Sequence, residues 1–100
     1  MKLRIEAAAE AETREAAEWY ERQRPGLGLE FLVAVDAAIQ LICLSPERSP
    51  RLETVPEEES VRRHLLKRFP FAIIYETTTS EIRIVAVAHT RRRPNYWADR

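Results

Sequence analysis

Residues 24–28, Arg24-Pro25-Gly26-Leu27-Gly28, divide the N-terminal half of the chain into two helices. This stretch holds the only two glycines of the sequence, beside a proline, and that combination ends a helix and lets the chain turn. Apolar side chains recur at helical spacing on both sides of it, over residues 8–23 and again over residues 29–44. The two segments are therefore predicted to form an antiparallel helical hairpin.

Strand-type patterns, which are short apolar runs bounded by turn residues, occur once before the hairpin and three times after it. The expected strands cover residues 3–6, 61–66, 71–77 and 81–88. Residues 46–60 hold three prolines and form a loop, with a further short strand expected near residues 52–55. The predicted fold class is α+β in a single domain of residues 1–100, with the order β-α-α-β-β-β and the helical hairpin packed on a mainly antiparallel sheet.

Alternation within the last predicted strand assigns its side chains to two faces of the sheet. Ile82, Ile84 and Ala86 are expected on one face. Val87 and His89 are expected to continue the other face. The histidine would then lie at the end of the strand, next to the basic tail.

Three features of the core follow from the side chains around these elements. Trp19 and Tyr20 are adjacent in the first helix, so packing uses only one of them fully and leaves the other free to contact a partner. Cys43 lies near the apolar stripe of the second helix and is expected to be a small core residue rather than a nucleophile. Trp97 is expected to fold back from the tail and cap the sheet.

Composition argues against several classes of protein. One cysteine cannot form an internal disulfide or a cysteine zinc site, and two distant histidines give no metal site. The sequence has no glycine-rich phosphate loop, so no cofactor is expected. The N-terminus lacks the apolar run of a signal peptide, and no stretch is expected to approach the length of a membrane span. The protein is therefore expected in the cytoplasm, without a membrane partner.

The net charge of zero conceals opposite charges on the two parts of the chain. Residues 1–61 carry 7 Lys/Arg and 13 Asp/Glu, and residues 62–100 carry 9 and 3, which gives −6 and +6. A basic C-terminal part indicates an acidic or polyanionic partner. The alternative is that the two parts mainly attract each other.

Two basic segments supply candidate side chains for binding a target. Residues 62–68 carry four positive charges and no acid, which is typical of a phosphate-binding strand or of a charged, solvated edge strand. The tail interleaves arginines with His, Tyr and Trp, which pair with phosphates, stack on bases or contact an acidic protein surface. The candidate target-binding residues are Arg62, Arg63, Lys67, Arg91, Arg92, Arg93 and Tyr96.

An ordered set of short motifs covers nearly the whole chain. The set comprises Trp19-Tyr20, Pro25-Gly26-Leu27-Gly28 with Phe31, Phe69-Pro70-Phe71 running into Ile73-Ile74-Tyr75, Ile84-Val85-Ala86-Val87, and His89 with Arg92 through Trp97. Together these motifs resemble the RelE/ParE superfamily of toxins, also called plasmid stabilisation proteins. The resemblance implies a toxin of a type II toxin–antitoxin system that a cognate antitoxin neutralises. Trp19 and Tyr20 are then the expected antitoxin contacts.

The resemblance implies one of two activities on the same fold. RelE-like members cut mRNA in the ribosome, whereas ParE-like members poison DNA gyrase and are not nucleases. The resemblance to the nucleases would place cations at three positions that hold other residues here. Two of these positions are occupied by Ala72 and Leu65, and the third, which is an arginine in the nucleases, falls near Thr90. The side chains that could still serve a nuclease are Arg63, His89, Arg91 and Tyr96.

Because these cations are missing, we expect a ParE-like inhibitor of DNA gyrase rather than an enzyme. One alternative is a RelE-like, ribosome-dependent mRNA endoribonuclease, with the ribosome and mRNA as its partners. A second alternative is a degenerate toxin that only binds its antitoxin.

Overall fold

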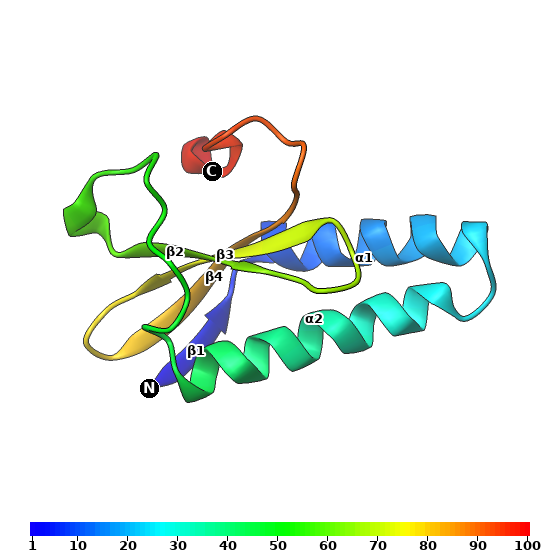
Figure 1. Ribbon diagram of the computed structural model, residues 1–100, viewed down its shortest axis with the longest axis horizontal. Coiled ribbons are helices and arrows are strands. Elements are labelled where there is room, and N and C mark those ends of the chain that lie inside the picture. Colours follow the sequence, from blue (N-terminus) through cyan, green and yellow to red (C-terminus); the bar gives the residue numbers. More distant parts are fainter.

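The computed structural model describes residues 1–100 and has a four-stranded sheet with a helical hairpin on one side (Figure 1). Its elements are β1 (Lys2–Ile5), α1 (Ala7–Gln23), α2 (Leu27–Leu44), β2 (Val61–Leu65), β3 (Phe71–Thr77) and β4 (Glu81–His89), with short 3₁₀ helices η1 (Glu57–Glu59) and η2 (Tyr96–Asp99). The strand order is β1-β4-β3-β2; β1 runs parallel to β4 and the other pairs are antiparallel. The predicted α+β class, the order of elements and the mainly antiparallel sheet are confirmed.

Two predictions about the elements differ from the structure by more than one residue. The strand expected near residues 52–55 is absent, although Pro50 and Leu52 each make one backbone hydrogen bond to β2, the edge strand. These bonds cover part of an edge that would otherwise be open. Helix α2 begins at Leu27, two residues before its predicted start, so that Gly28 lies inside the helix.

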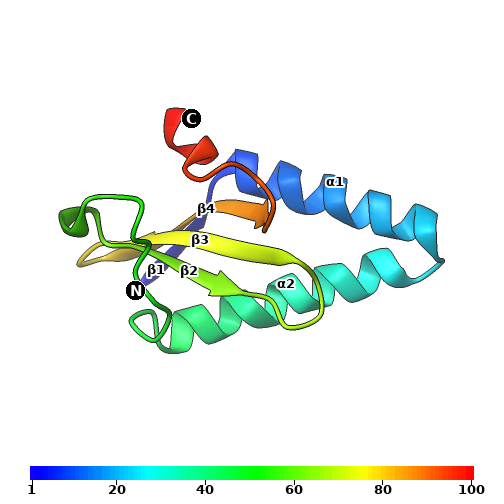
Figure 2. The same ribbon diagram turned by 45° about the horizontal axis from the view of Figure 1, so that its top comes forward.

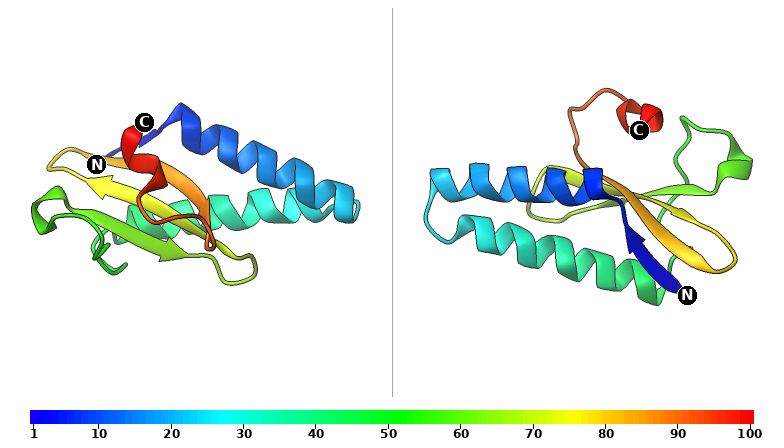
Figure 3. Two further views of the ribbon diagram at one scale, coloured as in Figure 1. Left: turned by 90° about the horizontal axis from the view of Figure 1, so that it is seen from above. Right: turned by 180° about the vertical axis from the view of Figure 1, so that it is seen from behind.

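Both glycines of the hairpin have a structural reason. Gly26 has φ 91°, a left-handed conformation that favours glycine. A Cβ on Gly28 would lie 2.6 Å from the carbonyl oxygen of Ala17, so only glycine allows α1 and α2 to approach this closely. The carboxylate of Glu21 accepts hydrogen bonds from the backbone N–H groups of both glycines, which satisfies donors at the start of α2. The hairpin extends beyond the end of the sheet (Figure 3).

The sheet buries side chains on both faces. The face toward the helices carries the main core, which contains Phe31, Val35, Ala38 and Ile42 of α2 and Ile73, Tyr75, Ile82, Ile84 and Val87 of the sheet. The other face has a smaller cluster made of Val61, Ala72, Ile74 and Ala86. Tyr96 and Trp97 pack on this smaller cluster, and in Figure 1 η2 lies on the side of the sheet opposite α2. The prediction that Trp97 caps the sheet is confirmed.

The predicted alternation along β4 is wrong in its second half because the strand contains an irregularity. Ile74 pairs with Ala86, but the next residue, Tyr75, pairs with Ile84, so Val85 is an extra residue in the ladder. The extra residue exchanges the faces of every later side chain. Val87 therefore joins Ile84 in the main core, and Ala86 turns to the smaller cluster.

Two expectations about α2 are also corrected. Cys43 is exposed, because the buried positions nearby are Ala38 and Ile42 and the thiol lies on the outer side of the helix. Contrary to the expectation about membrane spans, Leu27–Leu44 has 18 residues and a mean hydropathy of 2.0, enough by length and composition to cross a membrane. Its Phe31 and Ile42 nevertheless form part of the core between helix and sheet.

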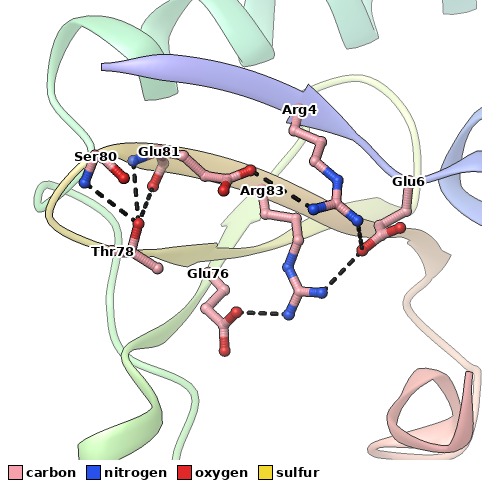
Figure 4. A network of polar contacts seen from close by, with 7 residues as sticks. All are labelled: Arg4, Glu6, Glu76, Thr78, Ser80, Glu81 and Arg83. Carbon is pink, nitrogen blue, oxygen red and sulfur yellow. Dashed lines mark hydrogen bonds and ion pairs between the residues drawn. The ribbon is translucent and has the colours of Figure 1, made fainter.

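Charged side chains connect three strands near the start of β4 (Figure 4). The guanidinium group of Arg83 donates to Glu6 at 2.9 Å and to Glu76 at 2.5 Å. Arg4 lies 3.7 Å from Glu6 and 4.0 Å from Glu81. Because solvent screens these half-exposed pairs, each contributes little to stability.

The close approach at Gly28 gives a stability prediction. Gly28→Ala should lower the free energy of unfolding by about 1–3 kcal/mol, because the new methyl group forces α1 and α2 apart. The matched control is Gly26→Asn, which should cost no more than about 1 kcal/mol, because asparagine tolerates the left-handed conformation and space is open there. Urea unfolding of both variants measures the difference. Equal losses would show that the close approach is not a constraint.

Candidate functional site

The edge of β4 beyond Ile84 has no neighbouring strand, because β1 ends at Ile5, which pairs with Ile84. Two side chains replace the missing strand. The carboxylate of Glu12 on α1 accepts a hydrogen bond from the Val87 N–H at 2.9 Å, and the Arg100 guanidinium donates to the Val85 carbonyl at 3.2 Å. Two backbone groups of this edge, the Val87 N–H and the Val85 carbonyl, are thereby satisfied, as buried backbone groups require.

The same carboxylate holds the C-terminal segment in place. Glu12 pairs with the Arg100 guanidinium at 2.6 Å and accepts a hydrogen bond from the Tyr96 hydroxyl. The side chain of Glu12 is only 16% exposed, so solvent screens these contacts weakly. Helix η2 consequently lies beside the start of α1 (Figure 2). We call Glu12, Tyr96 and Arg100 the tail clasp.

The environment of Tyr96 makes it a hydrogen-bond donor rather than a base. Burial, followed by the bond to Glu12, raises the pKa of the Tyr96 phenol above its ordinary value. The hydrogen bond that Arg100 donates to Glu12 also raises the pKa of Arg100. A phenol that already donates to a carboxylate keeps its proton, so it is poorly suited to take one from a ribose hydroxyl.

A second pair of contacts fixes the tail at Asn95, through the loop that precedes β2. The Thr54 hydroxyl donates to the Asn95 side-chain oxygen at 2.8 Å, and the Asn95 amide donates to the Thr54 carbonyl at 2.8 Å. Asn95 has φ 59°, a left-handed conformation that asparagine adopts more readily than most residues. Residues 91–93 therefore form a loop fixed at both ends.

The predicted target-binding cations lie on both faces of the sheet and in the tail. Arg62 pairs with Tyr75 on the helix side and donates to the Glu47 and Ser49 carbonyls at 3.1 and 2.6 Å, so it holds the loop after α2. Arg63 lies on the opposite face, as alternation requires, and Lys67 is exposed beyond the end of β2.

The three arginines of the tail are exposed together. Arg91 and Arg93 have no side-chain partner, and the guanidinium of Arg92 stacks 3.9 Å from the ring centre of Tyr96. Arg63, Arg92 and Arg93 also line a cavity of ≈ 230 Å³ beneath the tail. The structure thus brings Arg92 and Arg93 of the tail together with Arg63, but not with Arg62 or Lys67.

Most of the positions considered for a nuclease line the same cavity, but they do not complete a cationic site. Ala72 is 2% exposed and lines the cavity with Trp97. His89 accepts the Arg91 backbone N–H on its Nδ1 atom at 3.1 Å and packs edge-on against Phe71. The structure has no group of three or more His, Cys, Asp or Glu side chains placed to bind a metal ion.

Two grooves lie on opposite flanks of α1. The first, the hairpin groove, has a volume of ≈ 510 Å³ and lies between α1 and α2, where Leu29, Leu32 and Ile5 line it. The second, the tail groove, also measures ≈ 510 Å³ and lies between α1, the adjoining ends of β3 and β4, and the tail. Its lining includes Glu12, Glu15, Trp19, Tyr20, Pro70, Phe71, His89, Arg92 and Tyr96.

The adjacent aromatic residues of α1 have different roles. Tyr20 packs into a cluster with Phe31 and Phe69, with ring centres 5.2 and 4.9 Å away. Trp19 is 51% exposed and meets Tyr20 edge-on. Only one of the two is used in packing, as predicted, and it is Trp19 that remains available to a partner.

Sequence reasoning missed Glu12 and Arg100. The two residues are 88 positions apart, and each is an ordinary charged residue in its local pattern. The only available signal was that the last predicted strand is longer than the first. Part of its edge must therefore be covered by other groups.

The tail clasp gives a prediction about the folded tail. Glu12→Ala should lower the free energy of unfolding by about 1–3 kcal/mol, because the Val87 N–H loses its partner. It should also speed tryptic cleavage after Arg91 and Arg92, because the tail loses its anchor. The control Glu15→Ala removes an exposed carboxylate of the same helix and should change stability by no more than about 0.5 kcal/mol. Equal cleavage rates in the two variants would contradict the clasp.

Comparison with known proteins supports the fold and identifies the family. The structure is similar to a solved structure described as the chromosomal ParDE TA system from P. aeruginosa, with a TM-score of 0.78 and 21% sequence identity over 89% of this chain and 95% of that chain. Comparison with curated proteins gives no match. A family profile described as "ParE toxin of type II toxin-antitoxin system, parDE" matches residues 3–94. Because that match spans most of the sequence, the chain belongs to the ParE toxin family of type II toxin–antitoxin systems.

Proposed function

We propose that this toxin stops growth in the cytoplasm by inhibiting DNA gyrase, and that a cognate antitoxin neutralises it. The observation that carries the proposal is that the C-terminal tail covers the sheet face opposite the helices. Tyr96 and Trp97 cover that face, and Ala72 beneath them supplies no cation. Phosphodiester cleavage needs cations that stabilise a charged transition state and groups that move protons. A covered face with an alanine at Ala72, where the resemblance to the nucleases would place a cation, favours the ParE-like activity.

The exposed arginine loop supports a target that presents negative charge. Arg91, Arg92 and Arg93 lie next to one another on a loop whose ends are fixed, and none pairs with a carboxylate. Guanidinium groups form strong paired hydrogen bonds with carboxylates. A fixed loop also loses little conformational entropy on binding. We therefore assign target binding mainly to this loop, with Arg63 and Tyr96 behind it.

The hairpin groove supports a separate site for the antitoxin. Leu29 is 66% exposed and lines an apolar groove with Leu32 and Ile5. Acidic side chains lie along the same groove, so an amphipathic helix with an apolar stripe and basic flanks would fit it. Trp19 lies on the other flank of α1. We therefore propose the hairpin groove, rather than Trp19 and Tyr20, as the principal antitoxin contact.

A ribosome-dependent endoribonuclease is the second candidate. It is favoured by one observation, the proximity of His89, Arg63 and Tyr96 around the cavity beneath the tail. A nuclease would have to displace the tail to admit RNA, which the tail clasp opposes. A degenerate toxin that only binds its antitoxin would use the hairpin groove alone.

Removal of the three tail charges tests the gyrase proposal. Replacing Arg91, Arg92 and Arg93 together by Ala should lower the free energy of unfolding by about 1 kcal/mol or less, because these side chains are exposed. Growth arrest and induction of an SOS reporter should both be lost, because the target contacts are removed. Replacing Lys2, Arg22 and Arg48 by Ala produces the same net charge and should leave both effects intact.

The same experiment separates the two candidate activities. Inhibition of purified gyrase by the wild-type toxin, together with an active SOS reporter, is the expected result. Rapid arrest of translation with cleaved mRNA and a silent reporter would contradict it and favour the nuclease.

A charge in the hairpin groove tests the antitoxin site. Leu29→Glu should lower affinity for the antitoxin about tenfold or more, because a carboxylate would have to be buried without a partner. Growth arrest should persist and should no longer be rescued by the antitoxin. Leu44→Glu is the control, because Leu44 is 80% exposed on the same helix but does not line the groove. If Leu29→Glu is rescued as well as the control, the antitoxin binds elsewhere.

A further inference from the structure

We infer that the tail groove is a second binding site, which receives a large apolar side chain carried by an acidic segment of the target protein. The inference rests on the proposed function in one respect, that the toxin acts by binding a protein. It adds the place at which that protein is held and the chemistry of the bound segment.

The lining of the groove is suited to an apolar anchor. Trp19 exposes half of its surface beside a hollow of ≈ 510 Å³ that Pro70 and Phe71 also line. The edge-on contact with Tyr20, whose ring centre lies 5.2 Å away, fixes the indole from one side only. Exposed tryptophans beside preformed hollows are typical of the residues that dominate binding energy at protein interfaces.

The charges around the groove select an acidic segment. Arg92 lines it, and the residues before and after Arg92 in the chain, Arg91 and Arg93, are exposed and have no side-chain partner. Of the two acids in the lining, Glu12 is already paired with Arg100, which leaves Glu15 as the only unpaired negative charge. A segment with one or two carboxylates beside its anchor would therefore meet net positive charge.

A protein segment fits these features better than a nucleic acid does. The groove is mainly apolar, and its free carboxylate at Glu15 would repel a phosphate backbone. Only the tail side of the groove carries cations, whereas nucleic-acid sites usually present basic side chains along a whole track.

The groove is preformed because the tail clasp fixes its outer wall. Tyr96 is held by Glu12, and Arg92 is held in turn by stacking on Tyr96. Walls that come from a helix, a sheet and an anchored tail do not need to be ordered on binding, which improves affinity. The groove also lies across α1 from the hairpin groove, so the two sites can be altered independently.

Trp19→Ala in the full-length toxin is the direct test. Growth arrest should require about 30-fold more toxin, the effect expected when an anchoring aromatic contact is lost. Affinity for the antitoxin should stay within about twofold of the wild type, which also reports that the variant is folded. Trp19→Phe keeps an aromatic ring in the groove and should restore most of the activity. Thermal melting of both variants completes the comparison.

Three outcomes decide the inference. Growth arrest by Trp19→Ala at wild-type toxin levels would overturn it. Loss of growth arrest together with loss of antitoxin binding, in a variant that melts like the wild type, would also overturn it, because Trp19 would then be an antitoxin contact. Selective loss of growth arrest supports it.

Binding to purified gyrase separates this inference from the proposed function. If the wild type does not bind gyrase but Trp19→Ala selectively loses growth arrest, the gyrase proposal fails and the groove stands. If the wild type binds gyrase and Trp19→Ala binds it equally well, the groove fails and the gyrase proposal stands.

Discussion

The C-terminal half of the structure depends on a mismatch in length between two parallel strands. Strand β1 ends at Ile5, whereas β4 continues to His89, so part of the edge of β4 has no partner strand. Unpaired backbone groups that are buried destabilise a fold unless side chains satisfy them. Here Glu12 and Arg100 take that role, and their positions determine where the tail lies.

This local solution shapes the surface available to partners. Because Glu12 also binds Tyr96, the tail crosses the sheet face opposite the helices and covers the smaller cluster there. The same path leaves residues 91–93 exposed and forms the outer wall of the tail groove. One carboxylate therefore links the stability of the sheet edge to the covering of the sheet face opposite the helices, and to the exposure of the three arginines.

The sequence was sufficient to predict the elements and their order, because glycines at a helix break and alternating strands are local signals. It was insufficient where contacts are distant or the local pattern is uniform. Residues 84–88 are all apolar, so the extra residue at Val85 left no mark in the pattern and the faces after it were misassigned. Among the candidate site residues, only the structure could show that Arg62 holds a loop and that Glu12 holds the tail.

Amide hydrogen exchange at Val87 tests the role of the Glu12 carboxylate most directly. In the wild type, the Val87 amide should exchange as slowly as its neighbours in β4, although no strand lies beside it. In Glu12→Ala it should exchange about tenfold faster or more, while the amides that pair β3 with β4 stay protected. A Val87 amide that exchanges at the same rate in both proteins would contradict the account.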